Sequence, residues 1–512
     1  MIARFLLVFA ICIGPVWISH AQDKSEPSYS LHTEELHETA EAGHAHEPSP
    51  WSTIPFALLL IMIATGPIFY EHFWHHHYPK VALGLAALTV TYYLFILDNT
   101  HEPVHAFFEY FQFIALLAAL FVAAGGIMIQ IDKEGKPLIN TMLLLVGAVV
   151  ANIIGTTGAS MLLIRPFIRL NSRRIQPYHI VFFILMVSNV GGCLTPIGDP
   201  PLFLGFLKGV PFDWNLYHNF LPWLTAILIL GMIFYIYDTR FSKENPIFVQ
   251  EEDPVYSNRV SIVGSRNFLL LALIIACVFL DPAKISWVPG IIISEEYGVS
   301  IQTIASVPDT YGDHYTAFSF IRELLMLVLG FVSYRFANKR AILGNEFNFE
   351  PIREVAFIFI GIFGTMMPAL ELVGAFAASP EGAELINPNT LYWGTGLISG
   401  FLDNAPTYLN FFTAALAAKG GSINNAADVT AFAYGEGDFA GTTIYLVAIS
   451  VAAVFFGALT CIGNGPNFMV KSIAEQIGIQ MPSFFGYIVR YTVPILVPVL
   501  VIIWLLFIFS AT

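Results

Sequence analysis

Residues 188–205 place polar side chains inside an otherwise apolar part of the chain, and they include Ser188, Asn189, Thr195 and Asp199. The glycines and prolines of this stretch are Gly191, Gly192, Pro196, Gly198, Pro200 and Pro201. An unbroken helix cannot pass through them, because glycine is costly in a helix and proline removes an amide donor and clashes with the preceding turn. In a bilayer, non-helical backbone is tolerated only where it is buried in protein or lines an aqueous cavity. The stretch therefore predicts a binding site at membrane depth.

A second stretch, residues 457–468, repeats the pattern far downstream. Residues 194–201 align with residues 459–466, which pairs Thr195 with Thr460, Gly198 with Gly463 and Asp199 with Asn464. Two broken helices with similar chemistry predict an internal duplication.

The polar residues in and near the interruptions are of the kinds that coordinate sodium. Hydroxyls, amide carbonyls and the freed backbone carbonyls of a broken helix are oxygen ligands for a hard cation. The candidate cation-binding residues are Asn152, Thr156, Thr157, Ser188, Asn189 and Thr195 in the first half and Asn404, Thr407, Thr460, Asn464 and Asn467 in the second.

Asp199 and Asp403 are the carboxylates within these motifs, and we expect them to be the cation/proton exchange sites. Burial favours the neutral form of a carboxyl group and a bound cation favours the ionised form, so one group can hold either a proton or a cation. The alternative is structural, because a carboxylate at the start of a half-helix also accepts backbone amides as a cap.

The composition is that of a membrane protein. The chain of 512 residues is 56% hydrophobic and 12% charged, about half the charged fraction of a soluble domain. A net charge of -14 and scattered lysines and arginines argue against a nucleic-acid partner. We find no nucleophile-base pair, metal triad or phosphate-binding Gly-x-x-x-x-Gly-Lys motif, so we expect no enzyme activity and no cofactor beyond the transported Na⁺ and H⁺.

The amino-terminal part resembles a secreted leader followed by a polar segment. Residues 1–22 predict a signal peptide or an uncleaved first helix, and residues 23–50, rich in His and Glu, predict a disordered extracytoplasmic segment. Residues 51–79 predict an extra transmembrane helix and a polar turn at His75, His76 and His77.

The rest of the chain predicts two transport repeats. The first, residues 80–240, contains spans at about 80–97 and 106–129, a re-entrant hairpin at 138–170, a broken helix at 178–208 and a span at 217–237. Residues 241–316 form a connecting loop, a linking helix at 265–281 and an outer loop. The second repeat, residues 317–512, contains spans at 317–337 and 352–378, a hairpin at 389–415, a broken helix at 441–476 and a last helix at 484–510.

Basic residues set the predicted orientation. Lys and Arg flank the first hairpin and cluster again at 240–266 and 335–353, whereas residues 282–316 and 379–388 contain Lys284 alone. The positive-inside rule puts the basic loops in the cytoplasm, which makes the two repeats inverted, as in secondary transporters.

Four segments together resemble the ion transporter superfamily over about residues 80–510. They are Asn-Ile-Ile-Gly-Thr-Thr-Gly-Ala-Ser at 152–160, the interruption at 188–201, Leu-Asp-Asn-Ala-Pro-Thr at 402–407 and Gly-Asn-Gly-Pro-Asn at 463–467. The superfamily includes NhaD-type sodium/proton antiporters, citrate transporters, membrane subunits of arsenite pumps and divalent anion/sodium symporters. The Asp-Asn-x-Pro hairpin is similar to the NhaD-type branch. Where the symporters carry Ser-Asn-Thr tips, this chain has Ala151-Asn152-Ile153 and Asp403-Asn404-Ala405, which argues against dicarboxylate symport.

The resemblance implies an all-α polytopic membrane protein with inverted repeats, each carrying a re-entrant helical hairpin and a broken helix. It also implies a homodimer surrounded by membrane lipid. We expect a secondary transporter of the cell (inner) membrane that exchanges sodium or lithium for protons. Two alternatives stay open: a citrate or other carboxylate transporter coupled to a cation, and a membrane subunit that depends on a separate ATPase.

Overall fold

The computed structural model describes residues 48–241, 259–280, 282, 285, 287–294, 298–303, 306 and 315–511. The predicted leader and nearly all of the His- and Glu-rich segment lie outside the described residues.

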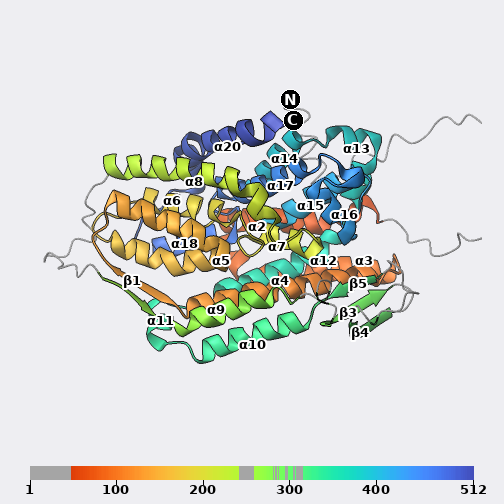
Figure 1. Cartoon of the computed structure of the whole chain (residues 1–512), viewed down its shortest axis with the longest axis horizontal. Helices are drawn as coiled ribbons and strands as arrows, with labels where there is room; N and C mark the ends of the chain where they lie inside the picture. Colours follow the sequence, from red (N-terminus) through yellow and green to blue (C-terminus); the bar gives the residue numbers. More distant parts are fainter. Residues whose placement is uncertain are drawn as a thin grey trace, which may run out of the picture.

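Helices dominate the fold, which confirms the predicted all-α polytopic class (Figure 1). The helices of the first half are α2 (Ile54–Phe69), α3 (Glu71–Phe95), α4 (His101–Gly125), α5 (Pro137–Leu170), α6 (Pro177–Met186), α7 (Pro200–Lys208), α8 (Trp214–Arg240) and α9 (Arg266–Cys277). Those of the second half are α10 (Ile321–Arg335), α11 (Lys339–Gly344), α12 (Glu350–Ala378), α13 (Pro380–Leu385), α14 (Pro388–Phe401), α15 (Asn404–Ala417), α16 (Ala426–Tyr434), α17 (Thr443–Phe456), α18 (Gly465–Gln476), α19 (Phe484–Tyr487) and α20 (Val497–Ile503). Within the described residues, five helices are long and apolar enough to cross a membrane: His101–Gly125, Pro137–Leu170, Trp214–Arg240, Glu350–Ala378 and Phe484–Ala511.

Two small sheets lie in the connecting segments, and the helical interpretation of the sequence did not include them. Strand β1 (Met128–Asp132) pairs antiparallel with β2 (Arg259–Val263), with Met128 opposite Val263. Strands β3 (Pro289–Ser294), β4 (Gly298–Thr303) and β5 (Tyr315–Phe318) form a sheet in the order β4-β3-β5. The pairing of β1 with β2 joins segments more than a hundred residues apart, so no local pattern announces it.

The histidine run is a correction to the sequence prediction. His75, His76 and His77 do not form a turn, because α3 runs through them and continues through Pro79 to Phe95. The chain turns earlier, at Tyr70, which separates α2 from α3. Short helices α11, α13 and α16 were also not predicted.

The helices form two groups that meet along the middle of the molecule (Figure 1). In one group α12 packs against α2, α3 and α4, and α10 packs against α4 and α9. In the other, α17 packs against α8, α14 and α15, and α5 packs against α8. Contacts of α4 with α5 and of α12 with α15 join the groups.

Helix α5 is a hairpin. A straight helix of its 34 residues would be roughly 50 Å long, yet residues near its two ends touch. Asn140 Nδ2 donates to Asn171 Oδ1 at 2.7 Å, and Asn171 Nδ2 donates back to Asn140 Oδ1 at 2.9 Å. The reversal occurs at Gly155, whose φ of 80° and ψ of 155° are open to glycine and strained for other residues. The interruption expected at 152–160 is therefore the tip of a helical hairpin.

The other interruptions also occur where the sequence places them. Helices α14 and α15 are separated by Leu402 and Asp403, both in extended conformation. The chain leaves the helix between α6 and α7 and again between α17 and α18. The inverted relation of the two halves stays a prediction.

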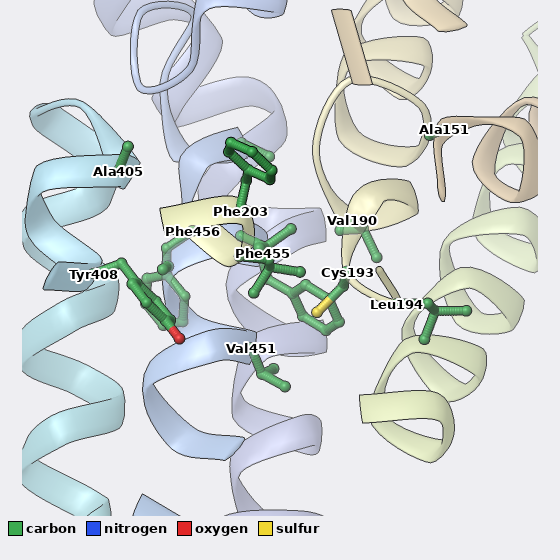
Figure 2. Packing of buried hydrophobic residues seen from close by; sticks show 14 of the residues in the cluster. Ala151, Val190, Cys193, Leu194, Phe203, Ala405, Tyr408, Val451, Phe455 and Phe456 are labelled. Atoms are coloured by element: carbon green, nitrogen blue, oxygen red, sulfur yellow. The ribbon is translucent and has the colours of Figure 1, made fainter. Parts of the chain in front are cut away.

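Buried apolar side chains hold the interrupted segments in place. Figure 2 shows Val190 and Cys193 of the first interruption in one cluster with Phe203 of α7 and Phe455 of α17, with Tyr408 of α15 beside them. All five are at most 2% exposed. This packing fixes the backbone around which the polar residues gather.

Candidate functional site

Each hairpin tip is hydrogen-bonded to the neighbouring interruption. Thr156 N donates to Gly198 O at 2.8 Å, and Thr195 Oγ1 donates to Asn152 O at 2.5 Å. In the second half Thr460 Oγ1 donates to Gly400 O at 2.7 Å. Asn152 and Gly400 both lie three residues before the break of their hairpin, and Thr195 and Thr460 are the residues that the two motifs align. The duplicated motif thus makes the same contact twice.

Asp199 lies at the meeting point of four segments. Its Oδ1 accepts a hydrogen bond from Thr156 Oγ1 at 2.7 Å and one from Asn464 Nδ2 at 3.1 Å. Its Oδ2 accepts a hydrogen bond from Asn404 Nδ2 at 2.6 Å. The first hairpin tip, the second hairpin tip and the second interruption therefore all converge on the carboxylate of the first interruption. Asp199 is 1% exposed, and the three donors compensate for part of the cost of burying its charge.

Aligned positions of the two halves take part in this cluster. Asp199 is the residue before α7 and Asn464 is the residue before α18, and both have extended backbone conformations. Thr156 follows the break at Gly155, as Asn404 follows the break at Asp403. The cluster is symmetric in position but not in charge, because Asn464 stands where the first half has an acid.

A second set of amides extends the cluster. Asn189 Nδ2 donates to Asn467 Oδ1 at 2.6 Å, and Asn464 Nδ2 lies 3.3 Å from Asn189 Oδ1. Asn467 Nδ2 donates to the backbone carbonyls of Gly457 and Thr460. Asn464 therefore contacts Asp199 directly, and Asn189 is connected to Asp199 through Asn464.

Three other candidates, Asn152, Ser188 and Thr407, hydrogen-bond to groups around the cluster and not to Asp199 itself. Asn152 bridges the first hairpin and the first interruption, accepting from Leu194 N and donating to Gly191 O. Ser188 Oγ is 2.8 Å from Ser160 Oγ, and Thr407 Oγ1 donates to Asp403 O. These bonds position the backbone of the site.

Asp403 has two features at once. It caps α15, with Ala405 N donating to its Oδ1 at 3.0 Å, and it lines a cavity. The structure therefore shows the capping contact considered for this residue, and it also places Asp403 in the lining of the cavity.

A cavity of about 450 Å³ lies next to the cluster. Five candidate residues line it: Thr156, Thr157, Asp403, Asn404 and Asn464. Exposed residues Glu346, Asn348, Glu350 and Gln476 also line it, so the cavity opens to the surface near α12 and the end of α18. In the topology predicted from the positive-inside rule, this side faces the cytoplasm.

The cavity contains one arginine among its described lining residues, Arg165, and that arginine already has a partner. Its Nη2 is 3.2 Å from Glu346 Oε2. Arg165 and Glu346 lie 181 residues apart, so no local sequence pattern reveals this pair.

Two buried charge networks lie outside the cavity. Lys208, at the end of α7, places its Nζ 2.8 Å from Glu109 Oε1 of α4, and both side chains are less than 10% exposed. Asp238 of α8 accepts from Asn140 Nδ2, Tyr178 Oη and Arg174 Nη2 at the open end of the first hairpin. In the sequence, the only sign of these networks is a charged residue within an apolar helix. Such a residue does not reveal which side chain is its partner.

The comparisons with known proteins agree with a transport function. The family described as “Putative citrate transport” matches the chain over residues 45–508. No curated protein matches the chain.

Proposed function

The chain belongs to the family described as “Putative citrate transport” and is a multi-pass membrane transport protein, and we propose that it exchanges sodium or lithium for protons by alternating access. The cation and the proton compete for Asp199, with Asp403 as the second exchange carboxylate. The proposal places the protein in the cell membrane with its amino-terminal segment outside, and as a homodimer.

One observation carries the proposal: a buried carboxylate surrounded by a hydroxyl and two amides from three other segments. Each neighbour of Asp199 also has an oxygen, so a sodium ion that enters the cluster finds hydroxyl and amide oxygens beside the carboxylate. A proton on Asp199 neutralises the charge that attracts the cation. The two ions are then alternatives at one site, which is the requirement for exchange.

The hydrogen bonds around Asp199 depend on the positions of both hairpin tips. Asp199 is held by residues of both halves, so a shift of either hairpin tip changes the hydrogen bonds around it. The cavity lies next to the cluster and opens to the surface near α12 and the end of α18. Alternating access requires a second conformation in which the same cluster opens to the other side.

The second candidate function is transport of citrate or another carboxylate, and the family description favours it. A bound carboxylate requires cationic or amide donors. Asn404 and Asn464 supply amides, but Arg165 is paired with Glu346, and Asp403 faces the same cavity. The charge around the cavity therefore favours a cation.

Exchange is tested with purified protein in liposomes that contain a pH-sensitive dye and an acidic interior. We expect external sodium or lithium, but not potassium, to make the interior alkaline. Asp199→Asn abolishes this signal, and Asp403→Asn reduces it at least roughly tenfold because a carboxylate is lost at the site. Asparagine is as good a helix cap as aspartate, so loss of exchange in Asp403→Asn cannot come from loss of the cap.

The matched control is Asp438→Asn, which removes an exposed carboxylate outside the cavity and should leave exchange unchanged. Labelled citrate is added to the same liposomes. Citrate uptake without any sodium-dependent alkalinisation refutes the exchange proposal and establishes the carboxylate alternative.

A further inference from the structure

The cavity beside the site is much larger than a sodium ion. Its volume of about 450 Å³ falls within the range of about 300–1,000 Å³ that is typical of small-molecule pockets. A bare cation and its first waters leave most of this space unused. The passage of sodium therefore does not account for the size of the cavity, and the chemistry of its lining residues indicates which larger ligand it fits.

Most of the wall is apolar and partly aromatic. Phe468 of α18 lines the cavity and is partly exposed, whereas Trp74 of α3, Phe121 of α4 and Phe359 of α12 line it with at most 5% of their surface exposed. His75 also lines it, and its ring lies 6.2 Å from that of Phe468. Aromatic faces attract organic cations within about 6 Å of the ring centre.

The charge of the lining is negative. Glu346, Glu350, Glu354 and Asp403 line the cavity, with Arg165 as the one arginine among the described lining residues. Two of these acids have basic partners: Glu346 pairs with Arg165 at 3.2 Å and Glu350 pairs with Arg353 at 2.7 Å.

Glu354 and Asp403 form no ion pair with a lysine or arginine among the described residues. Glu354 is half-buried on the wall, near His75, Glu350 and Arg353, whereas Asp403 lies at the inner end beside Asn404. The cavity is thus lined by two acids without an ion pair to lysine or arginine among the described residues, Glu354 on the wall and Asp403 at the site, together with aromatic side chains.

We infer that this cavity binds an amphipathic organic cation, a molecule with an aromatic or apolar body and one positive charge. The apolar body covers Phe468 and the other accessible apolar surface of the wall, and the charge lies near Glu354 or Asp403. Anions of the same size are repelled by the same acids. The inference rests on the proposed function in one respect: an occupied cavity blocks sodium/proton exchange, because it denies sodium the way to Asp199.

Tetraphenylphosphonium is a suitable probe, because its anionic counterpart tetraphenylborate has nearly the same size and apolar surface. Binding of radiolabelled tetraphenylphosphonium to the detergent-purified full chain is measured at equilibrium, without any ion gradient. We expect saturable binding of the cation and at least tenfold weaker binding of the anion, since reversing one charge beside partly dry acids changes the interaction by more than a factor of roughly ten.

Glu354→Gln should weaken cation binding roughly tenfold, because one charge is lost from the wall. The matched control is Glu436→Gln, an exposed acid outside the cavity, which should bind as the wild type does. If Glu354→Gln fails to fold, Phe468→Ala and the comparison of cation with anion on the wild-type protein still decide the question. Equal binding of the two ions, or cation binding that neither Glu354→Gln nor Phe468→Ala weakens, overturns the inference.

The binding assay separates this inference from the proposed function. Saturable cation binding in a protein that shows no sodium-dependent alkalinisation leaves the cavity site intact and refutes exchange. Exchange in a protein that does not bind the organic cation refutes the cavity inference and leaves the proposed exchange intact. If both hold, tetraphenylphosphonium inhibits exchange, and Glu354→Gln raises the inhibitory concentration by the same factor as it weakens binding.

Discussion

Asp199 combines almost complete burial with three side-chain donors. An isolated charge at this depth would be very costly, and the donors reduce that cost without removing it. The residue is therefore stable as a carboxylate only within the assembled cluster. The proposed exchange at Asp199 therefore depends on neighbours supplied by the other half of the chain.

The hydroxyl of Thr156 provides a test at the scale of one hydrogen bond. Thr156→Val keeps the shape of the side chain and removes its donor to Asp199. A hydrogen bond to a charged group is worth about 1.5–3 kcal/mol, so the rate of sodium/proton exchange at limiting sodium should fall roughly tenfold or more. The rate is measured in the liposome assay.

Thr53→Val is the matched control, since Thr53 donates only to the backbone carbonyl of Pro50, far from the site in sequence and outside the cavity lining. Unchanged exchange in Thr156→Val means that this bond has no part in ion binding.

The elements that matter most are the two hairpins and the two interruptions. The sequence predicted each of them, because glycine, proline and polar residues inside apolar segments are strong local signals. It could not predict which residues meet. Asn404 and Asp199 are 205 positions apart, and their contact depends on how α15 packs against α7.

The same limit explains the networks and strands that the sequence did not reveal. Glu109 was recognisable as a charge in an apolar helix, but its partner Lys208 lies on a short helix that begins only after the first interruption. Strands β1 and β2 pair across a long sequence separation, and neither is stable alone. Non-local contacts of this kind leave no periodic pattern in the chain.

Gly155 tests the hairpin as an element. Gly155→Ala forces a side chain onto a backbone with φ of +80°, and its Cβ would lie 3.1 Å from Ile197 O. Conformations of this type cost about 1–3 kcal/mol for residues other than glycine, so the thermal unfolding temperature of the purified protein should fall. Unfolding is followed by intrinsic fluorescence in detergent.

Gly84→Ala is the control for this prediction, because no atom lies within 4 Å of the added Cβ and the backbone is helical. Alanine favours helix over glycine by about 1 kcal/mol, so this variant should be as stable as the wild type or more stable. Equal unfolding temperatures for the two variants would contradict the strained turn at Gly155.

At the scale of the whole molecule, the cavity opens to the surface at one end of the helices. Exposed residues before and at the start of α12 and at the end of α18 line its opening, and the distribution of lysine and arginine predicts that both segments lie on the cytoplasmic side. Under the predicted topology, the structure corresponds to a conformation open to the cytoplasm, and the proposed alternating access requires another that is open to the outside.

Labelling from each side of the membrane tests this orientation. Gln476→Cys should react with a membrane-impermeant maleimide in inside-out vesicles and not in right-side-out vesicles, because Gln476 is exposed at the cavity mouth. Asp438→Cys, on the segment between α16 and α17, should show the reverse. Cys193, Cys277 and Cys461 are buried, so the wild-type chain gives the background. Labelling of both variants from the same side would refute the predicted topology.

The pairing of Asp199 with Asn464 also bears on how such a site changes over evolutionary time. The two residues occupy matching positions before their half-helices, and they are hydrogen-bonded to each other. Aspartate and asparagine codons differ by a single base, so a lineage can gain or lose a charge at either position without altering the backbone. A duplicated gene that began with identical halves could thus acquire its ion chemistry, or exchange it for another, by one substitution at the junction of the two copies.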